Sequence, residues 1–128
     1  MTQSFEADTR RIFDGTEEID IETSGSDGAP VHRTTIWIVV DGDGVYVRSV
    51  RGPAGRWYRE LLANPRGAVH AGDTVVPVQA YPATDPATIA RVSDAFNHKY
   101  QARWPGPTAS VLRDEVLATT LRLEPRSP

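Results

Sequence analysis

The sequence predicts a mainly β fold with flanking helices, which belongs to the α+β class. Short runs rich in Val, Ile, Thr and aromatic residues recur along the chain, and glycine–aspartate turns separate several of them. Helical patterns lie between these runs without the alternation of βαβ units, which favours antiparallel strands. A small sheet of this kind either closes into a barrel or stays open with helices at its edges. We expect the barrel, because closure removes exposed strand edges.

The chain of 128 residues has the length of one domain, and we expect residues 1–128 to form a single domain because no internal linker divides them. The expected elements, in chain order, are a helix over 4–13, a strand over 17–23, a hairpin over 31–50, a helix over 53–65, a hairpin over 67–81, a helix over 85–100, a short helical segment after 108, and a final strand over 115–125.

The hairpins are predicted from their turns. Asp41-Gly42-Asp43-Gly44 contains the residue types that tolerate the positive φ of tight turns, and apolar runs flank it on both sides. This residue pattern lacks the spaced oxygen ligands of a calcium loop, so we interpret it as a turn. The second hairpin turns at Ala71-Gly72-Asp73.

The helices are predicted from their ends and from apolar spacing. Pro53 suits a first helical turn, and Pro65 ends the same segment. The buried side chains expected at i, i+4 spacing are Trp57, Tyr58, Leu61 and Leu62. The N-terminal helix is expected to bury Phe5, Ile12 and Phe13. The helix over 85–100 is expected to be capped by Asp85, with Ile89, Val92, Phe96 and Tyr100 on one face.

Composition excludes several classes of protein. The formal net charge is -3, which argues against nucleic acid or an anionic membrane as partner. No cysteine is present, so disulfides, thiolate zinc sites and cysteine nucleophiles are excluded. The N-terminus lacks the apolar core of a signal peptide, and no apolar run approaches the ~20 residues that span a bilayer. We therefore expect a cytoplasmic protein.

The common catalytic and metal motifs are missing. His32, His70 and His98 lie far apart and form no ligand pair, so we expect no metal. Ser49 does not lie in a G-x-S-x-G elbow, and the sequence has no phosphate-binding Walker loop, dinucleotide fingerprint or paired carboxylates. His32 is the histidine of most interest, because it enters a strand that we expect to face an arginine-containing loop.

Arginines cluster between Val45 and Gly67. This segment contains a single acid, Glu60, and five arginines: Arg48, Arg51, Arg56, Arg59 and Arg66. Two of them flank the end of an expected strand, and Arg56 lies near a helix N-terminus, where free N–H groups attract phosphate. The planar guanidinium matches phosphate oxygens, and glycines at 52 and 55 allow close approach of the backbone. The sequence thus predicts an anion site at Arg48, Ser49, Arg51, Gly52 and Arg56, with Arg59 and Arg66 solvated.

Two alternatives remain for this cluster. The arginines can form a solvated helix face, in which Arg56 and Glu60 at i, i+4 contribute only tenths of a kcal/mol. Single-stranded nucleic acid also binds arginines beside aromatic rings. Nucleic acid is disfavoured because the basic patch is confined to one strand, loop and helix, and because Trp57 and Tyr58 are accounted for as helix core.

The same stretch resembles a known family. A strand ending in Arg-Ser, a glycine-containing loop, a helix reading WYRELLANP and a short strand resemble the split β-barrel flavin and deazaflavin oxidoreductases, a pyridoxamine-phosphate-oxidase-like family. The similarity runs over residues 34–78 and is nearest to the deazaflavin-dependent nitroreductase-like group and an allied uncharacterised family. It implies an antiparallel split β-barrel, a homodimer, and FMN or a deazaflavin coenzyme bound at or near the subunit interface.

The resemblance also implies roles for individual residues. Residues matching Arg48 and Ser49 contact the cofactor phosphate in that family, and those matching Arg51, Gly52, Arg56 and Trp57 line the loop and helix start around it. Residues matching Thr35, Ile36 and Trp37 lie along the ring system. Two departures are Thr35-Ile36, where the nitroreductase-like group often has Pro-Leu, and Glu60, where it often has Asn. The choice between FMN and deazaflavin therefore stays open.

The functional hypothesis is hydride transfer from the bound ring to an unknown small molecule. Arg33 is expected to offset negative charge that develops on the ring. Tyr46, Tyr58, Tyr100 and Trp104 are candidate cavity walls, of which Tyr58 and Tyr100 are better accounted for as core. No residue is identified as a proton donor. The alternatives are a non-catalytic module of the same fold that holds a cofactor or haem, and an interaction domain with solvated arginines.

Overall fold

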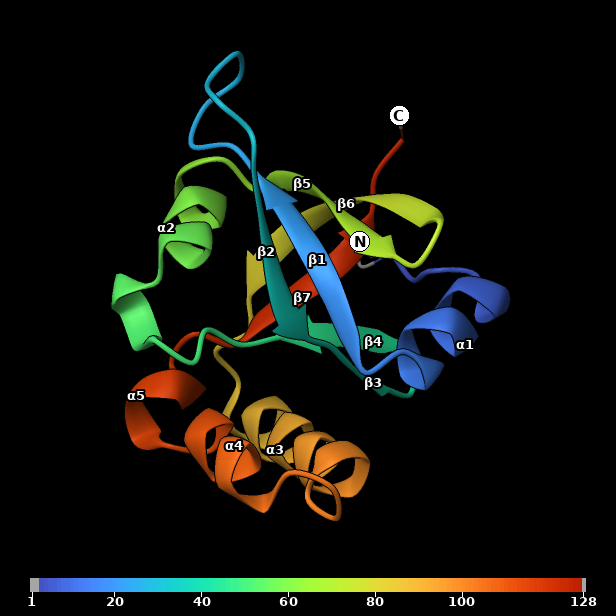
Figure 1. The fold of residues 1–128 in the computed structure, drawn as a ribbon, viewed down its shortest axis with the longest axis vertical. Coiled ribbons are helices and arrows are strands. Elements are labelled where there is room, and N and C mark those ends of the chain that lie inside the picture. The colour runs from blue at the N-terminus through green and yellow to red at the C-terminus, as the bar shows by residue number, and fades with distance from the viewer. Residues whose placement is uncertain (1–2, 128) are drawn as a thin grey trace.

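Seven strands form one curled antiparallel sheet in the computed structural model, which describes residues 3–127 (Figure 1). The strand order is β2-β1-β5-β6-β7-β4-β3. The strands are β1 (Glu18–Thr23), β2 (His32–Trp37), β3 (Val39–Asp41), β4 (Gly44–Val47), β5 (Arg66–Ala71), β6 (Thr74–Pro82) and β7 (Leu121–Pro125). In the described part of the chain the outer strands β2 and β3 form no ladder with each other, so the sheet is an open half-barrel. This is the antiparallel split β-barrel of the α+β class.

The helices cover the ends and one side of the half-barrel. They are α1 (Ala7–Gly15), the short 3₁₀ helix η1 (Gly52–Ala54), α2 (Arg56–Ala63), α3 (Pro86–Tyr100), α4 (Pro105–Val111) and α5 (Asp114–Leu117). Figure 1 shows α3, α4 and α5 gathered at one end of the sheet, with α2 and α1 on opposite sides of it. None of the helices within residues 3–127 combines the length and the apolar character needed to cross a bilayer.

The hairpin expected over 31–50 is only partly correct. Val39–Asp41 pairs with Gly44–Val47 around the predicted turn, whereas residues 32–37 leave the hairpin and pair with β1, placing Ile36 opposite Ile19. The chain changes partner at the fully buried Ile38. Its N–H donates to the Tyr100 hydroxyl at 3.3 Å, and its carbonyl accepts from Lys99 Nζ at 2.7 Å. These contacts from α3 satisfy the backbone groups that a continuous ladder would otherwise use, and no local pattern announces them.

The C-terminal strand is shorter than expected. β7 begins at Leu121, whereas residues 114–117 form α5. The hydroxyls of Thr119 and Thr120 donate to the carbonyls of Val116 and Leu117, at 2.6 and 2.7 Å. Such local side-chain bonds compete with an extended backbone and hold the turn after α5.

Most of the predicted apolar faces are confirmed. Phe5 and Phe13 are buried and meet edge to face with ring centroids 5.4 Å apart, although α1 begins at Ala7, and Ile12 lies at the surface. In α2 the expected stripe is right at Trp57, Tyr58 and Leu61 and wrong at Leu62, which is 49% exposed.

The core has two parts. One fills the half-barrel between β1, β4, β5, β6 and β7, and the other packs β3 and β4 against α3, α4 and α5. In the second part Asp85 caps α3 through a bond from the Thr88 N–H at 3.0 Å. The predicted face of α3 is buried at Val92, Phe96 and Tyr100, whereas Ile89 is half-buried.

Candidate functional site

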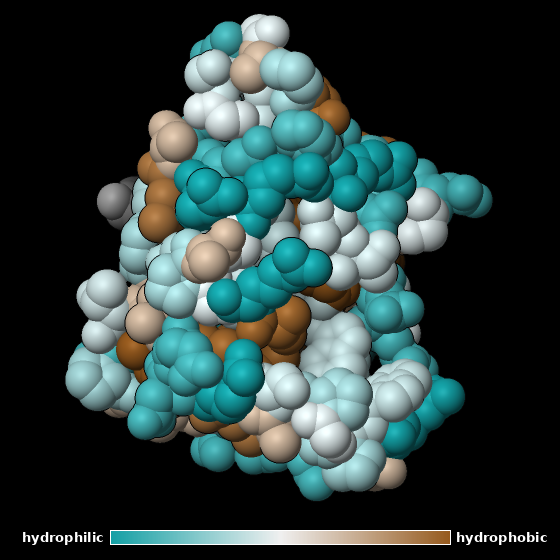
Figure 2. Space-filling view, turned by 60° about the vertical axis from the view of Figure 1, so that its left-hand side comes forward, coloured by the Kyte–Doolittle hydropathy of each residue, from teal (hydrophilic) through white to brown (hydrophobic). Residues whose placement is uncertain are grey.

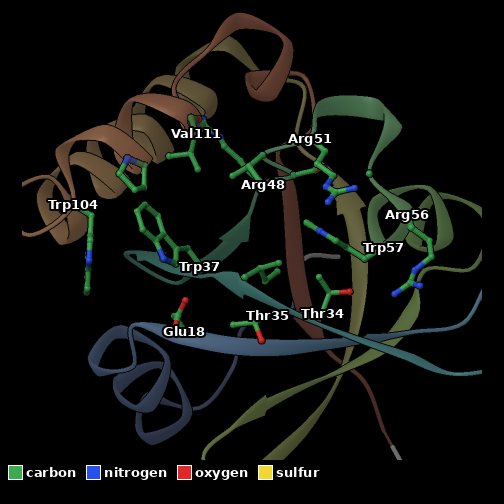
Figure 3. Close-up of a pocket in the computed structure, with 15 residues that line it drawn as sticks. Glu18, Thr34, Thr35, Trp37, Arg48, Arg51, Arg56, Trp57, Trp104 and Val111 are labelled. Carbon is green, nitrogen blue, oxygen red and sulfur yellow. The ribbon is translucent and has the colours of Figure 1, made fainter.

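A cavity of about 870 Å³ lies between the edge strand β2, the loop that follows β4, the start of α2, and α4. Its lining comprises residues 34–37, 48–51 and 55–57 together with Glu18, Trp104, Pro107 and Val111 (Figure 3). Figure 2 shows this side of the molecule, where hydrophilic residues surround a recess in which hydrophobic and neutral residues are visible. The size is within the range of small-molecule sites, about 300–1,000 Å³.

The structure gathers most of the predicted site residues in this cavity. Thr35, Ile36, Trp37, Arg48, Ser49, Arg51, Arg56 and Trp57 all line it. The remaining two lie outside the lining. Arg33 is exposed on β2, where it donates to Asp20 Oδ2 at 3.0 Å, and Gly52 is buried within the loop, at the start of η1. Gly52 has φ of 69°, and a Cβ there would touch the Glu115 side chain, so this glycine shapes the loop.

Arg48 is a buried cation with neutral partners. Its side chain is 2% exposed, and its guanidinium donates to Thr120 Oγ1, Ser93 Oγ and the carbonyls of Val111 and Ile89, at 2.9, 3.0, 3.2 and 2.9 Å. It also lies over the Phe96 ring, 5.3 Å from the centroid. Arg48 thereby joins the end of β4 to α3, α4 and the start of β7.

Four of the five Arg48 N–H donors are engaged by these bonds, which leaves one on Nη2 without an acceptor in the described chain. Burial lowers the pKa of Arg48 to about 10, so the group stays charged at neutral pH. No carboxylate within residues 3–127 pairs with it. Arg48 therefore contributes a fixed positive charge to the cavity wall and at most one further hydrogen bond.

Ser49 braces the loop from inside. Its hydroxyl donates to the Gly52 carbonyl at 2.8 Å, and its N–H donates to Thr119 Oγ1 at 2.9 Å. A Cβ on Gly55 would collide with Ser49 Oγ, so glycine at 55 is what lets the start of α2 approach this hydroxyl. These contacts fix the path of residues 49–55, which carries Arg51 to the cavity rim.

Arg51 and Arg56 differ from Arg48 in having no partners. Both are exposed at the cavity, and within residues 3–127 neither makes a side-chain hydrogen bond or an ion pair. Arg56 is the first residue of α2, whose N-cap Gly55 supplies no side-chain cap. Two free guanidinium groups thus lie beside the uncapped first turn of a helix, where the helix dipole adds to their positive charge.

Glu60, one helical turn after Arg56, is occupied elsewhere. Its carboxylate accepts from Thr23 Oγ1 at 2.7 Å and contacts His32 Nδ1 at 2.9 Å. Burial opposes ionisation, but the bonds from Thr23 and His32 and the charge of Arg56 outweigh it and lower the Glu60 pKa. The strand that His32 enters faces the arginine loop across the cavity, as expected. His32 itself contacts Glu60 on the helix after that loop and does not line the cavity.

The opposite end of the cavity is aromatic. Trp37 stacks on Tyr100 with centroids 3.9 Å apart and planes within 3°, and Trp104 lies 6.1 Å from Trp37 at an angle of 43°. Figure 3 shows Trp37, Trp104 and Glu18 grouped here, with Arg51, Arg56 and Trp57 at the other end. Of the candidate wall residues, Trp104 lines the cavity, whereas Tyr58 and Tyr100 are buried in the core as expected and Tyr46 is buried as well.

Sequence reasoning missed Glu18. The antiparallel register of β1 and β2 places Glu18 directly opposite Trp37, and this pairing is what brings the carboxylate to the cavity. The two residues are far apart along the chain, and an acid at the start of a strand carries no local signal of a site.

The fold and this cavity define a split-barrel protein with a candidate site at its open edge. Residues 10–123 match a family model described as "Uncharacterized protein conserved in bacteria (DUF2255)", and the chain belongs to this family. No curated protein sequence matches the chain significantly.

Solved structures share the fold at low identity. One is HutZ, a heme storage protein from Vibrio cholerae, with a TM-score of 0.69 and 12% identity over 98% of this chain and 93% of that one. Another is an F420-H2-dependent reductase, with a TM-score of 0.64 and 17% identity over 84% of this chain and 93% of that one. A third is a pyridoxamine 5'-phosphate oxidase candidate from Listeria innocua, with a TM-score of 0.64 and 14% identity over 94% of this chain and 92% of that one. They confirm the resemblance in fold to the split-barrel proteins.

Proposed function

We propose that this chain binds a phosphorylated flavin-type cofactor, FMN or a deazaflavin, in the cavity and transfers hydride from it to a small molecule. The observation that carries the proposal is the pair of unpartnered arginines, Arg51 and Arg56, at one end of a cavity whose other walls are aromatic rings and an open strand edge. Such a cavity suits a ligand with a phosphate at one end and a flat ring at the other.

The phosphate end fits on geometry. Arg51 and Arg56 reach the cavity with all their guanidinium N–H groups free within the described residues, and the uncapped first turn of α2 adds backbone donors. Arg48 adds a fixed charge from behind and its one remaining N–H. In this assignment Ser49 and Gly52 support the site by holding the loop.

The ring end fits along β2. This strand pairs with β1 on one side, and its other edge has no partner strand in the described chain, so outward backbone N–H and C=O groups of residues 34–37 face the cavity. They can hydrogen-bond the polar edge of a ring that lies along Thr35, Ile36 and Trp37. When bound, the ring supplies the hydride chemistry, and the protein supplies position, charge and shielding from water.

Haem fits this cavity less well. Haem iron takes an axial His, Cys, Met or Tyr ligand, and none of these is among the described lining residues. His32 and His70 are held by Glu60 and Glu22 outside the lining. A non-catalytic module that holds a cofactor stays the second candidate, because the fold is shared with a heme storage protein.

We also propose a homodimer, as the family resemblance implies. The cavity opens beside the unpaired edge of β2, where a second subunit can complete its wall. Sedimentation equilibrium of the purified chain measures this directly, and a monomer at all concentrations would contradict it.

The function is tested by titrating FMN and a deazaflavin coenzyme into the purified protein and following ring fluorescence. Arg51→Ala and Arg56→Ala should each lose about 1.5–3 kcal/mol of binding free energy, since each removes a charge-assisted contact to phosphate. Arg66→Ala is the matched control, because Arg66 is exposed on β5 away from this cavity. Equal affinity of all variants, or no binding of either cofactor at micromolar concentration, would reject the proposal. Bound cofactor that never turns over with any acceptor would favour the non-catalytic module.

A further inference from the structure

The aromatic end of the cavity carries a carboxylate without a counter-ion. Glu18 is exposed at the cavity, and its carboxylate makes no hydrogen bond or ion pair within residues 3–127. In Figure 3 its carboxyl group lies beside Trp37, on the side of the cavity away from Arg51 and Arg56. This placement makes the cavity dipolar, with free cations at one end and a free anion at the other.

The neighbouring acids do not share this property. Glu17 pairs with Arg103, and Lys99 lies close enough to Asp14 and Glu17 to feel the charge of both. Glu18 is the acid of this group that lines the cavity, and no cation of the described chain lies within salt-bridge distance of it. Its charge acts on the nearby Tyr100 hydroxyl, but no ion pair of the described residues neutralises it at the cavity.

Two indole rings stand beside this charge. Tyr100 covers one face of Trp37, and Trp37 presents the rest of its ring to the cavity. Trp104 is tilted by 43° relative to Trp37 with a centroid separation of 6.1 Å, and the Arg103 guanidinium lies 4.6 Å from the Trp104 ring centroid, so each indole keeps only part of its surface for a ligand. Indole faces are electron-rich and attract cations, and a flat ligand gains stacking in addition.

We propose that the Glu18 end of the cavity binds a flat organic cation, held by the faces of Trp37 and Trp104 and by the Glu18 carboxylate. The arginines at the opposite end repel such a ligand and so fix its position along the cavity. The inference rests on the proposed function in one respect, because it names the substrate class of the reductase. Binding of the cation itself requires no cofactor.

The test compares two ligands of nearly the same shape, N-methylquinolinium and quinoline, by calorimetry and by tryptophan fluorescence at neutral pH. The cation should bind the wild-type protein more tightly than the neutral ring. Glu18→Gln should weaken the cation about threefold to tenfold and leave quinoline unchanged, as expected for an exposed charge pair supported by cation–π contact. Glu6→Gln removes an equal charge from the exposed segment before α1 and should change neither ligand.

A second variant separates the aromatic from the ionic contribution. Trp104→Leu should weaken both ligands, because it removes one of the two indole rings that line this end of the cavity, and circular dichroism reports whether the fold is kept. Equal affinity for the two ligands, or equal loss of both in Glu18→Gln, would overturn the proposal. FMN titration of the wild type and of Glu18→Gln distinguishes this inference from the proposed function. If the protein binds FMN but Glu18→Gln still prefers the cation as the wild type does, only this inference is overturned. If Glu18→Gln loses the preference for the cation but the protein never binds FMN, only the cofactor proposal is overturned.

Discussion

The interior and the rim of the cavity use the same residue type for different purposes. Arg48, at the strand end, is buried and donates four hydrogen bonds to neutral acceptors from three segments of the chain. Arg51 and Arg56, a few residues later, are exposed and have no partner in the described chain. The difference teaches that a cluster of arginines in a sequence can contain both an arginine that stabilises the interior and arginines left free to contact a ligand, and that counting their hydrogen bonds separates the two.

Removal of the buried Arg48 guanidinium should have the largest effect on stability. Arg48→Met should lower the free energy of unfolding by about 2–5 kcal/mol, because it leaves buried hydroxyls and carbonyls of several segments without their donor. Urea denaturation measures this. Arg51→Met is the matched control and should stay within about 0.5 kcal/mol of wild type, as expected for an exposed side chain. Similar losses of stability in both variants would contradict the distinction between the buried Arg48 and the exposed Arg51.

If Arg48→Met does not fold, milder variants keep this comparison open. Ser93→Ala removes one acceptor of the guanidinium and should cost about 0.5–1.5 kcal/mol. No change in stability there would show that the hydrogen bonds around Arg48 contribute little.

A substitution in the loop over residues 49–55, which joins Arg48 to Arg51 and Arg56, should have an intermediate effect on stability. Gly55→Ala should destabilise the protein by about 1–3 kcal/mol, since the added Cβ collides with the buried Ser49 hydroxyl. In the Ser49→Ala background the same change should cost less, because the colliding oxygen is gone. A double-mutant cycle by urea denaturation tests this, and strictly additive losses would contradict it.

A second cation, the half-buried Lys99, allows a test by pH, and we expect the smallest effect there. Lys99 Nζ donates to the carbonyls of Phe13, Thr16 and Ile38 at 2.9, 2.8 and 2.7 Å, and burial lowers its pKa to about 8 from 10.5. Between these values the unfolded chain binds more protons than the folded one. The Lys99 contribution to the free energy of unfolding should therefore rise as pH increases from about 8 to about 10.5.

Denaturant titrations of wild type and Lys99→Met over this pH range measure the difference in slope. Asp14 and Glu17, the acids whose charges act on Lys99, are present in both proteins, so their own effects are shared except for their coupling to Lys99. Parallel curves would mean that Lys99 titrates in the folded protein as it does in the unfolded chain.

Local chemistry was sufficient for much of the fold and for part of the site. The turn at 41–44, the hairpin predicted over 67–81 and the cap at Asp85 follow from residues adjacent in sequence, and each is present in the structure. The arginine loop was also visible, because strand end, loop and helix start are contiguous. These features depend on turn, cap and helix-end preferences that act over a few residues.

What only the tertiary structure decided depends on residues distant in sequence. The change of strand partner at Ile38 is fixed by Lys99 and Tyr100. The structural role of Arg48 is fixed by acceptors on α3, on α4 and in the turn before β7, and the place of Glu18 by strand pairing with β2. The sequence by itself determined that a positive loop precedes a short helix in an antiparallel α+β protein. Packing decided which arginine is consumed in the interior, which ones face the cavity, and that a carboxylate stands opposite them, because burial and long-range partners set the free energy of each charge.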